Sequence, residues 1–198
     1  MTKHTLIVLP FLALAACNGA NSGSSANAAP AGNASEDMTA SPVQASSNVA
    51  EASANSAPTD AATYLAKAGA GDLFEIESSK AIMEKTKNAE VNSFAKMMVD
   101  DHGKSTAKLK AAAQAAKLPT SPPTLEPKQQ QAVDSIRAAQ GDAADRLYLD
   151  AQRMAHSDAL ALHRGYESGG DTAQLKAAAA DIAPVVQHHI DMLAKIKP

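Results

Sequence analysis

The stretch Ala89–Lys117, AEVNSFAKMMVDDHGKSTAKLKAAAQAAK, decides the fold of this chain. Its apolar residues recur every three or four positions, and this spacing places them on one face of an α-helix. The stripe consists of Val91, Phe94, Ala95, Met98, His102, Leu109 and Ala113. A helix with one apolar face is stable only when that face packs on another element, so the stretch predicts a domain built by packing.

Similar stripes on both sides of this stretch predict that the neighbouring elements are helices too. We expect helices over 59–87 and over 127–168, the second bent or broken at Gly141, and a last helix after Asp171. Prolines within 118–123 end the helix before them, because proline lacks the backbone donor. No segment has the alternating pattern of a strand. The predicted fold class is therefore all-α, an antiparallel four-helix bundle with one broken helix.

The N-terminus has the features of a targeting signal. Leu14-Ala15-Ala16-Cys17 closes the apolar run LIVLPFLALAA and resembles the lipobox of bacterial lipoproteins. We expect a signal peptide over 1–16, cleavage before Cys17, and acylation of Cys17, including palmitate, as the membrane anchor. The run is too short to span a bilayer. Asn18 is not the aspartate that retains enteric lipoproteins in the inner membrane, so the outer membrane, facing the periplasm, is favoured.

Composition divides the rest of the chain in two. Residues 17–58 are mostly Ala, Ser, Asn, Gly, Pro and Thr, which cannot bury enough apolar surface to fold, and they predict a disordered tether. Residues 59–198 form the helical domain. This domain holds 17 of the 18 Lys and Arg residues and 18 of the 21 Asp and Glu residues, a net charge of −1. So balanced a charge argues against a nucleic-acid partner.

Five of the six histidines lie in the helical domain, and two of them fall within apolar stripes. His102 and His189 lie near the centres of their stripes, and Glu75 borders the apolar face of the first helix. Bundle cores hold metal ions between inward histidines and carboxylates. One candidate metal set therefore takes one residue from each helix: Glu75, His102, His156 and His189. Alternatively, the histidines are core residues hydrogen-bonded to neighbours, and no cofactor is required.

The spacing of the candidate ligands along the sequence restricts the type of metal. Ferritin-like di-iron sites use Glu-x-x-His on two helices, but Val99, Arg153 and Val186 stand three residues before the histidines. A methionine thioether and a histidine imidazole four residues apart lie on one helix face, and this pair of ligands suits copper. The possible accessory ligands are Met98, His163, His188 and Met192. Since the one cysteine is the predicted lipidation site and no nucleophile or phosphate-loop motif is present, the sequence favours a protein that is not an enzyme.

Several sequence blocks together resemble a known family. FAKMMVDDH ending at His102, DRLY ending at Tyr148, and HIDM beginning at His189 are similar to signature blocks of the bacterial domain of unknown function 4142 family. The resemblance implies a ferritin-like four-helix bundle that is usually exported, often lipid-anchored and without established enzymatic activity. Its matching positions are Glu75, His102, Tyr148, His156 and His189. His163, in a usually apolar position, and the additional His188 depart from the pattern.

Three functions follow as hypotheses. The first is a lipid-anchored envelope accessory or binding protein, related to stress, whose partner is another envelope protein. The second is a bundle that binds copper or iron and has a redox or metal-handling role. The third is a purely structural lipoprotein. The sequence does not indicate an oligomeric state.

Overall fold

The computed structural model describes residues 57–197. The predicted signal peptide (1–16), Cys17 and nearly all of the predicted tether (17–58) lie outside the described residues. Over 57–197 the chain forms helices and no strand, which confirms the all-α prediction. The helices are α1 (Ala61–Met83), α2 (Ala89–Ala115), α3 (Pro127–Ala138), α4 (Gly141–Gly169) and α5 (Ala173–Leu193).

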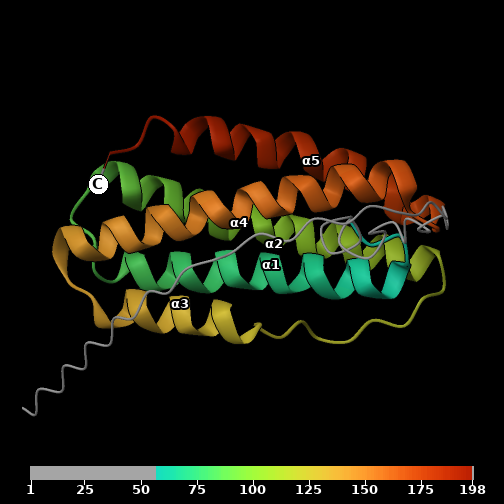
Figure 1. Ribbon diagram of the computed structural model, residues 1–198, viewed down its shortest axis with the longest axis horizontal. Helices are drawn as coiled ribbons and strands as arrows, with labels where there is room; N and C mark the ends of the chain where they lie inside the picture. Colours follow the sequence, from blue (N-terminus) through green and yellow to red (C-terminus); the bar gives the residue numbers. More distant parts are fainter. Residues whose placement is uncertain (1–56, 198) are drawn as a thin grey trace, which may run out of the picture. The chain divides into compact units, whose positions relative to one another are not determined.

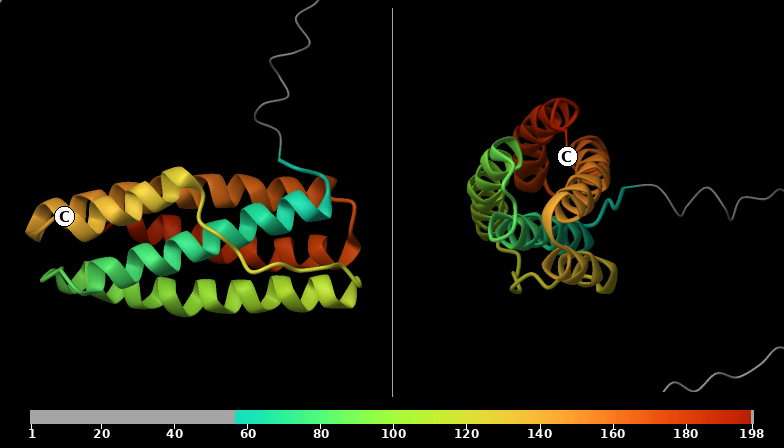
Figure 2. Two further views of the ribbon diagram at one scale, coloured as in Figure 1. Left: turned by 90° about the horizontal axis from the view of Figure 1, so that it is seen from below. Right: turned by 90° about the vertical axis from the view of Figure 1, so that its left-hand side faces the viewer.

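Four of the helices close a ring. α1 packs against α2 and α4, and α5 packs against the same two helices on the opposite side. α1 and α5 run in one direction and α2 and α4 in the other, so each ring helix is antiparallel to both neighbours (Figure 1). α3 contacts α1 and α4 and lies outside the ring, as the end-on view shows (Figure 2).

The third helical segment differs from the prediction of one broken helix. The chain does break before Gly141, whose φ of 54° is one that glycine adopts without steric cost. However, α3 and α4 run in opposite directions (Figure 1). α2 ends at the opposite end of the bundle from the start of α4, so residues 116–140 must return along its length. α3 is thus a separate fifth helix within a long crossover, the kind of connection found in ferritin-like bundles.

The turn between α1 and α2 is set by a helix cap. The Asn88 side chain accepts hydrogen bonds from the backbone N–H groups of Glu90 and Val91, which fixes the start of α2. To reach this cap the chain leaves α1 at Met83, four residues before the end predicted at Lys87.

A polar layer divides the apolar core. One apolar cluster lies near the α1–α2 turn and includes Ile82, Phe94 and Leu149. A second lies near the α4–α5 turn and includes Tyr64 and Leu175. Each ring helix contributes a buried polar residue between the two clusters: Glu75 in α1, His102 in α2, His156 in α4 and His189 in α5.

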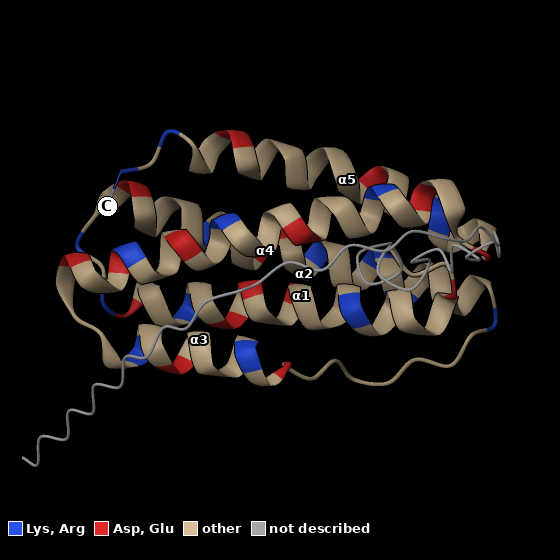
Figure 3. Cartoon of the chain, viewed as in Figure 1, with Lys and Arg blue, Asp and Glu red and all other residues tan. Residues whose placement is uncertain are grey.

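The outer surface carries both signs of charge. Acidic and basic residues are interspersed along the helices in the view of Figure 3. Among residues 57–197, no helix is long and apolar enough to cross a membrane.

Candidate metal centre

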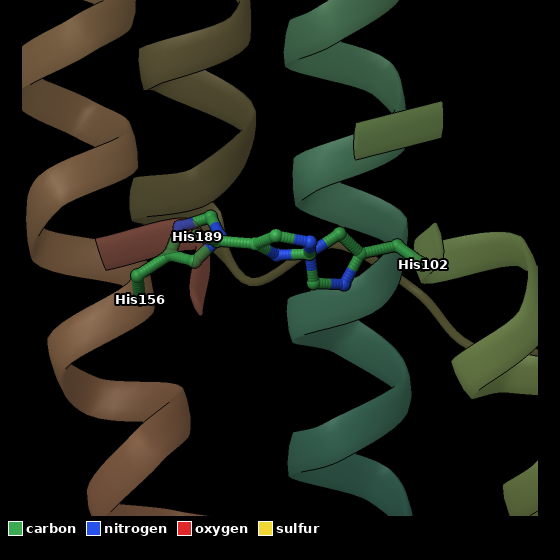
Figure 4. Close-up of side chains that lie close together, drawn as sticks. All are labelled: His102, His156 and His189. Carbon is green, nitrogen blue, oxygen red and sulfur yellow. The ribbon is translucent and has the colours of Figure 1, made fainter. Parts of the chain in front are cut away.

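Three histidines from three helices meet in the polar layer. His102, His156 and His189 direct their rings toward one another (Figure 4), and one nitrogen from each lies within 4.8 Å of the other two. His156 Nε2 and His189 Nδ1 are 3.2 Å apart. All three residues are buried, with exposed fractions of 3%, 0% and 1%. We call them the three-histidine cluster.

At His102 the nitrogen that faces away from the cluster is held by two carboxylates of α1. His102 Nδ1 lies 2.9 Å from Asp72 Oδ1 and 2.8 Å from Glu75 Oε2. Both carboxylates are buried, with exposed fractions of 4% and 1%. Since carboxylates accept hydrogen bonds, His102 Nδ1 carries a proton.

The other two rings are held in the same way. His156 Nδ1 lies 2.9 Å from the Gln152 carbonyl oxygen, to which it donates. Glu75 Oε1 lies 3.1 Å from the same nitrogen but accepts no hydrogen bond. His189 Nε2 lies 3.2 Å from Asp101 Oδ2. Both outer nitrogens therefore face acceptors and carry protons.

The inner nitrogens are left with lone pairs. A neutral imidazole has one N–H group and one lone pair, so a proton on each outer nitrogen leaves a lone pair on His102 Nε2, His156 Nε2 and His189 Nδ1. Two of these lone pairs would face each other at 3.2 Å. His102 Nε2 is buried without a hydrogen-bond partner. A positive charge at the centre, from an added proton or a metal ion, would be compatible with this arrangement.

Without metal, that positive charge resides on His102. Burial alone lowers the pKa of His102, but the negative charge of Glu75 and the hydrogen bond to Asp72 outweigh burial and raise the pKa to about 10. Burial and the charge of His102 lower the pKa of His189 to about 4, and burial lowers the pKa of His156. One cluster imidazole is therefore protonated at neutral pH, and the other two are neutral.

The carboxylates respond to the same charges. Burial alone would raise the pKa of Glu75, but the positive charge of His102 outweighs it and the pKa is lowered. Burial raises the pKa of Asp72. Buried carboxylates occur in proteins mainly where a positive group compensates them. The centre thus has the negative charge to compensate a cation.

A single ion fits these residues better than a di-iron pair does. In ferritin-like di-iron sites the carboxylates coordinate and bridge the metals, whereas here Asp72 and Glu75 lie beside the outer nitrogen of His102. Hydrogen bonds from the outer nitrogens of metal-binding histidines to carboxylates and carbonyls are the usual support of such ligands. The three-histidine cluster has this support on every ring.

The four possible accessory ligands are not members of the three-histidine cluster. Met98 belongs to the apolar cluster near the α1–α2 turn, and Met192 packs against that cluster. His188 is exposed.

His163 has a different partner. Its Nδ1 lies 2.9 Å from the Tyr64 hydroxyl, and the Tyr64 ring stacks on Tyr166 with centroids 3.8 Å apart. Burial lowers the pKa of His163 to about 4, so the ring is neutral at neutral pH.

Three residues that hold the histidine rings, Asp72, Asp101 and Gln152, were not among the predicted site residues. Asp72 precedes Glu75 by three residues, a spacing that puts both carboxylates on one helix face. The Thr106 hydroxyl donates to Asp72 Oδ2 at 3.0 Å. Gln152 supplies the carbonyl for His156 and donates from its amide to Ser78 Oγ at 3.0 Å. The three-residue spacing of Asp72 and Glu75 could have identified Asp72 in the sequence, whereas no sequence pattern marks Gln152.

The fold and the centre define a ferritin-like helical domain with a buried polar layer. Residues 45–196 match the family described as a domain of unknown function, DUF4142, and the chain belongs to that family. A solved fragment of a DUF305 protein from Deinococcus radiodurans is similar in structure, with a TM-score of 0.59 and 13% identity, over 70% of this chain and 95% of that one. At this identity the likeness concerns the fold alone. A comparison with curated proteins finds no match.

Proposed function

We propose that this domain binds one transition-metal ion between His102 Nε2, His156 Nε2 and His189 Nδ1, and that it handles metal in the cell envelope. The observation that carries the proposal is the orientation of the rings: all three outer nitrogens face hydrogen-bond acceptors, which leaves the other nitrogen of each ring to bind a cation. On this observation we favour the metal-binding hypothesis over the accessory-protein hypothesis.

The charge of the centre favours a divalent ion. Three neutral imidazoles add no charge, and Asp72 and Glu75 together carry two negative charges when both are ionised. Binding of the metal displaces the inner proton of His102, because a ligand nitrogen must be deprotonated. Imidazole ligands suit zinc, copper, iron and nickel, and among divalent ions copper binds such sites most tightly.

Three protein ligands leave one coordination position open. Structural zinc sites usually have four protein ligands, whereas sites that exchange water or substrate usually have three. Phe94 flanks the cluster, with its ring centroid 6.2 Å from that of His156 and 6.4 Å from that of His189. We propose metal storage or transfer without assigning a catalytic reaction.

The proposed location rests on the sequence. We propose that acylated Cys17 anchors the protein in the outer membrane and that the domain faces the periplasm. The lipobox-like stretch before Cys17 and the asparagine after it support this proposal.

Metal titration tests the function. The purified protein is stripped with chelator and titrated with Cu(II), Zn(II) and Fe(II), with bound metal and thermal unfolding measured. We expect one ion per chain and a stabilisation of about 2.7 kcal/mol when free metal is 100 times the dissociation constant. His102→Gln, His156→Gln and His189→Gln should each abolish the stabilisation.

His188→Gln is the matched control, because it removes an exposed histidine next to His189. The control should retain both stoichiometry and stabilisation. No stoichiometric metal in the parent protein, or equal losses in His188→Gln and His189→Gln, would contradict the proposal and restore the accessory-protein or structural hypothesis.

A further inference from the structure

The three-histidine cluster touches a partly exposed group at one point. Within residues 57–197, its hydrogen-bond partners Asp72 and Gln152 are buried, and so is Glu75 beside it. The remaining partner, Asp101 of α2, has a side chain that is 25% exposed and that lies 3.2 Å from His189 of α5. Asp101 therefore links solvent to the cluster at the seam between α2 and α5.

The opposite side of the bundle is covered. α3 packs over α1 and α4, where Val133 contacts a small apolar cluster with Phe74 and Ala151. Among the described helices, none lies over the seam between α2 and α5. A second polar contact across this seam, Lys108 with Asp181 at 2.6 Å, is itself exposed. The seam is thus the shorter way from solvent to the histidines.

Asp101 has the chemistry to capture a cation there. One of its oxygens contacts His189, and the other pairs with Lys104 Nζ at 2.8 Å. The Lys104 side chain is 76% exposed and can move away into solvent.

We propose that Asp101 is the access residue through which a divalent cation reaches the three-histidine cluster. Its carboxylate attracts the cation to the seam between α2 and α5, and its contact with His189 Nε2 keeps the Nδ1 lone pair directed inward. Lys104 opposes access, because it occupies the carboxylate and repels the cation. This proposal rests on the proposed metal-binding function and adds the route and the residues that set its rate.

The test is the rate of metal uptake by the chelator-stripped full-length protein, measured by stopped flow with Zn(II) and Cu(II). In Asp101→Asn the amide oxygen can still accept from His189, but the negative charge is gone. Asp100→Asn is the matched control, because it removes the same charge from the exposed neighbouring position. Lys104→Gln removes the opposing charge at an exposed position where the fold is not at risk.

We expect uptake to be about tenfold slower in Asp101→Asn, within about twofold of the parent in Asp100→Asn, and faster in Lys104→Gln. The differences should shrink at high salt, because exposed charges are screened. Asp100→Asn and Lys104→Gln should bind the same final amount of metal as the parent. A structural role alone would change the melting temperature without changing the order of these rates.

Equal uptake rates in Asp101→Asn and Asp100→Asn, or slower uptake in Lys104→Gln, would overturn the access route while leaving the metal site intact. A parent protein that binds no metal would overturn both proposals. If Asp101→Asn does not fold, the Lys104→Gln rate decides the question by itself.

Discussion

We expect His163 to lower the free energy of unfolding of the protein as the pH falls. The folded protein keeps this imidazole neutral, with a pKa lowered by burial to about 4, whereas the unfolded chain takes up the proton at the ordinary pKa of 6.5. The unfolded state therefore binds more protons between these values, and stability falls as pH falls. The loss from this one group is about 2 kcal/mol at pH 5 and about 3 kcal/mol at pH 4.

The variant for this test must remove His163 without leaving a buried hydroxyl unpaired. His163→Leu alone leaves the Tyr64 hydroxyl without its partner and should cost about 1 to 3 kcal/mol. Tyr64→Phe together with His163→Leu removes both groups of the hydrogen bond. This double variant should lie within about 1 kcal/mol of the parent at pH 7.5, since replacing both partners by apolar groups of similar shape is nearly neutral.

Urea denaturation of the metal-stripped proteins at pH 7.5 and pH 5 measures the effect. Between these two conditions the parent should lose about 2 kcal/mol more than the double variant, because titration of the cluster histidines and carboxylates is common to both. His188→Gln, which removes an exposed histidine, should follow the parent. Equal losses in the parent and the double variant would show that His163 is protonated in the folded protein or exchanges with solvent, and the reasoning from burial would be wrong.

Two further predictions concern glycines and the anchor. Gly71→Ala should raise the free energy of unfolding by about 0.5 to 1 kcal/mol in urea denaturation, because a Cβ there meets no atom within 4 Å. Gly69→Ala should give no such gain, since its Cβ would lie 3.2 Å from Pro123 Cβ, and equal gains would contradict the packing argument. Cys17→Ser should abolish incorporation of labelled palmitate and leave an uncleaved precursor; equal labelling of mutant and parent would refute the proposed anchor.

The sequence predicted the helices better than their arrangement. The apolar stripe of Ala89–Lys117 located α2 to within two residues at its end, since periodicity reports directly which face is buried. Periodicity does not report direction, so α3 was expected to form part of one broken helix with α4. The direction of α3 depends on where α2 ends in space, which no local pattern contains.

Only part of the candidate site could be predicted, because the periodicity of the sequence reports which residues are buried and not which partners they meet. His102 and His189 interrupt apolar stripes, and this marks them as inward residues even without a structure. Asp72 follows Gly71 and looks like a solvated residue, because its burial depends on His102 from a different helix. Which ring nitrogen faces inward depends on partners such as the Gln152 carbonyl, and side-chain spacing along the sequence carries no information about it.

The polar layer also bears on how the two helical hairpins are aligned. The crossover separates α1 and α2 from α4 and α5, and many of the buried side chains on these helices are alanines, including Ala68, Ala95 and Ala179. Alanine side chains are small and interdigitate little between packed helices. Sliding one hairpin by a helical turn, about 5.4 Å, would therefore lose few side-chain packing contacts. Such a slip would, however, move Glu75 away from His156 and leave both buried among apolar groups. We infer that the centre fixes the register of the two hairpins. Its polar residues, such as Glu75 and His156, would thus have a structural role even when no metal is bound.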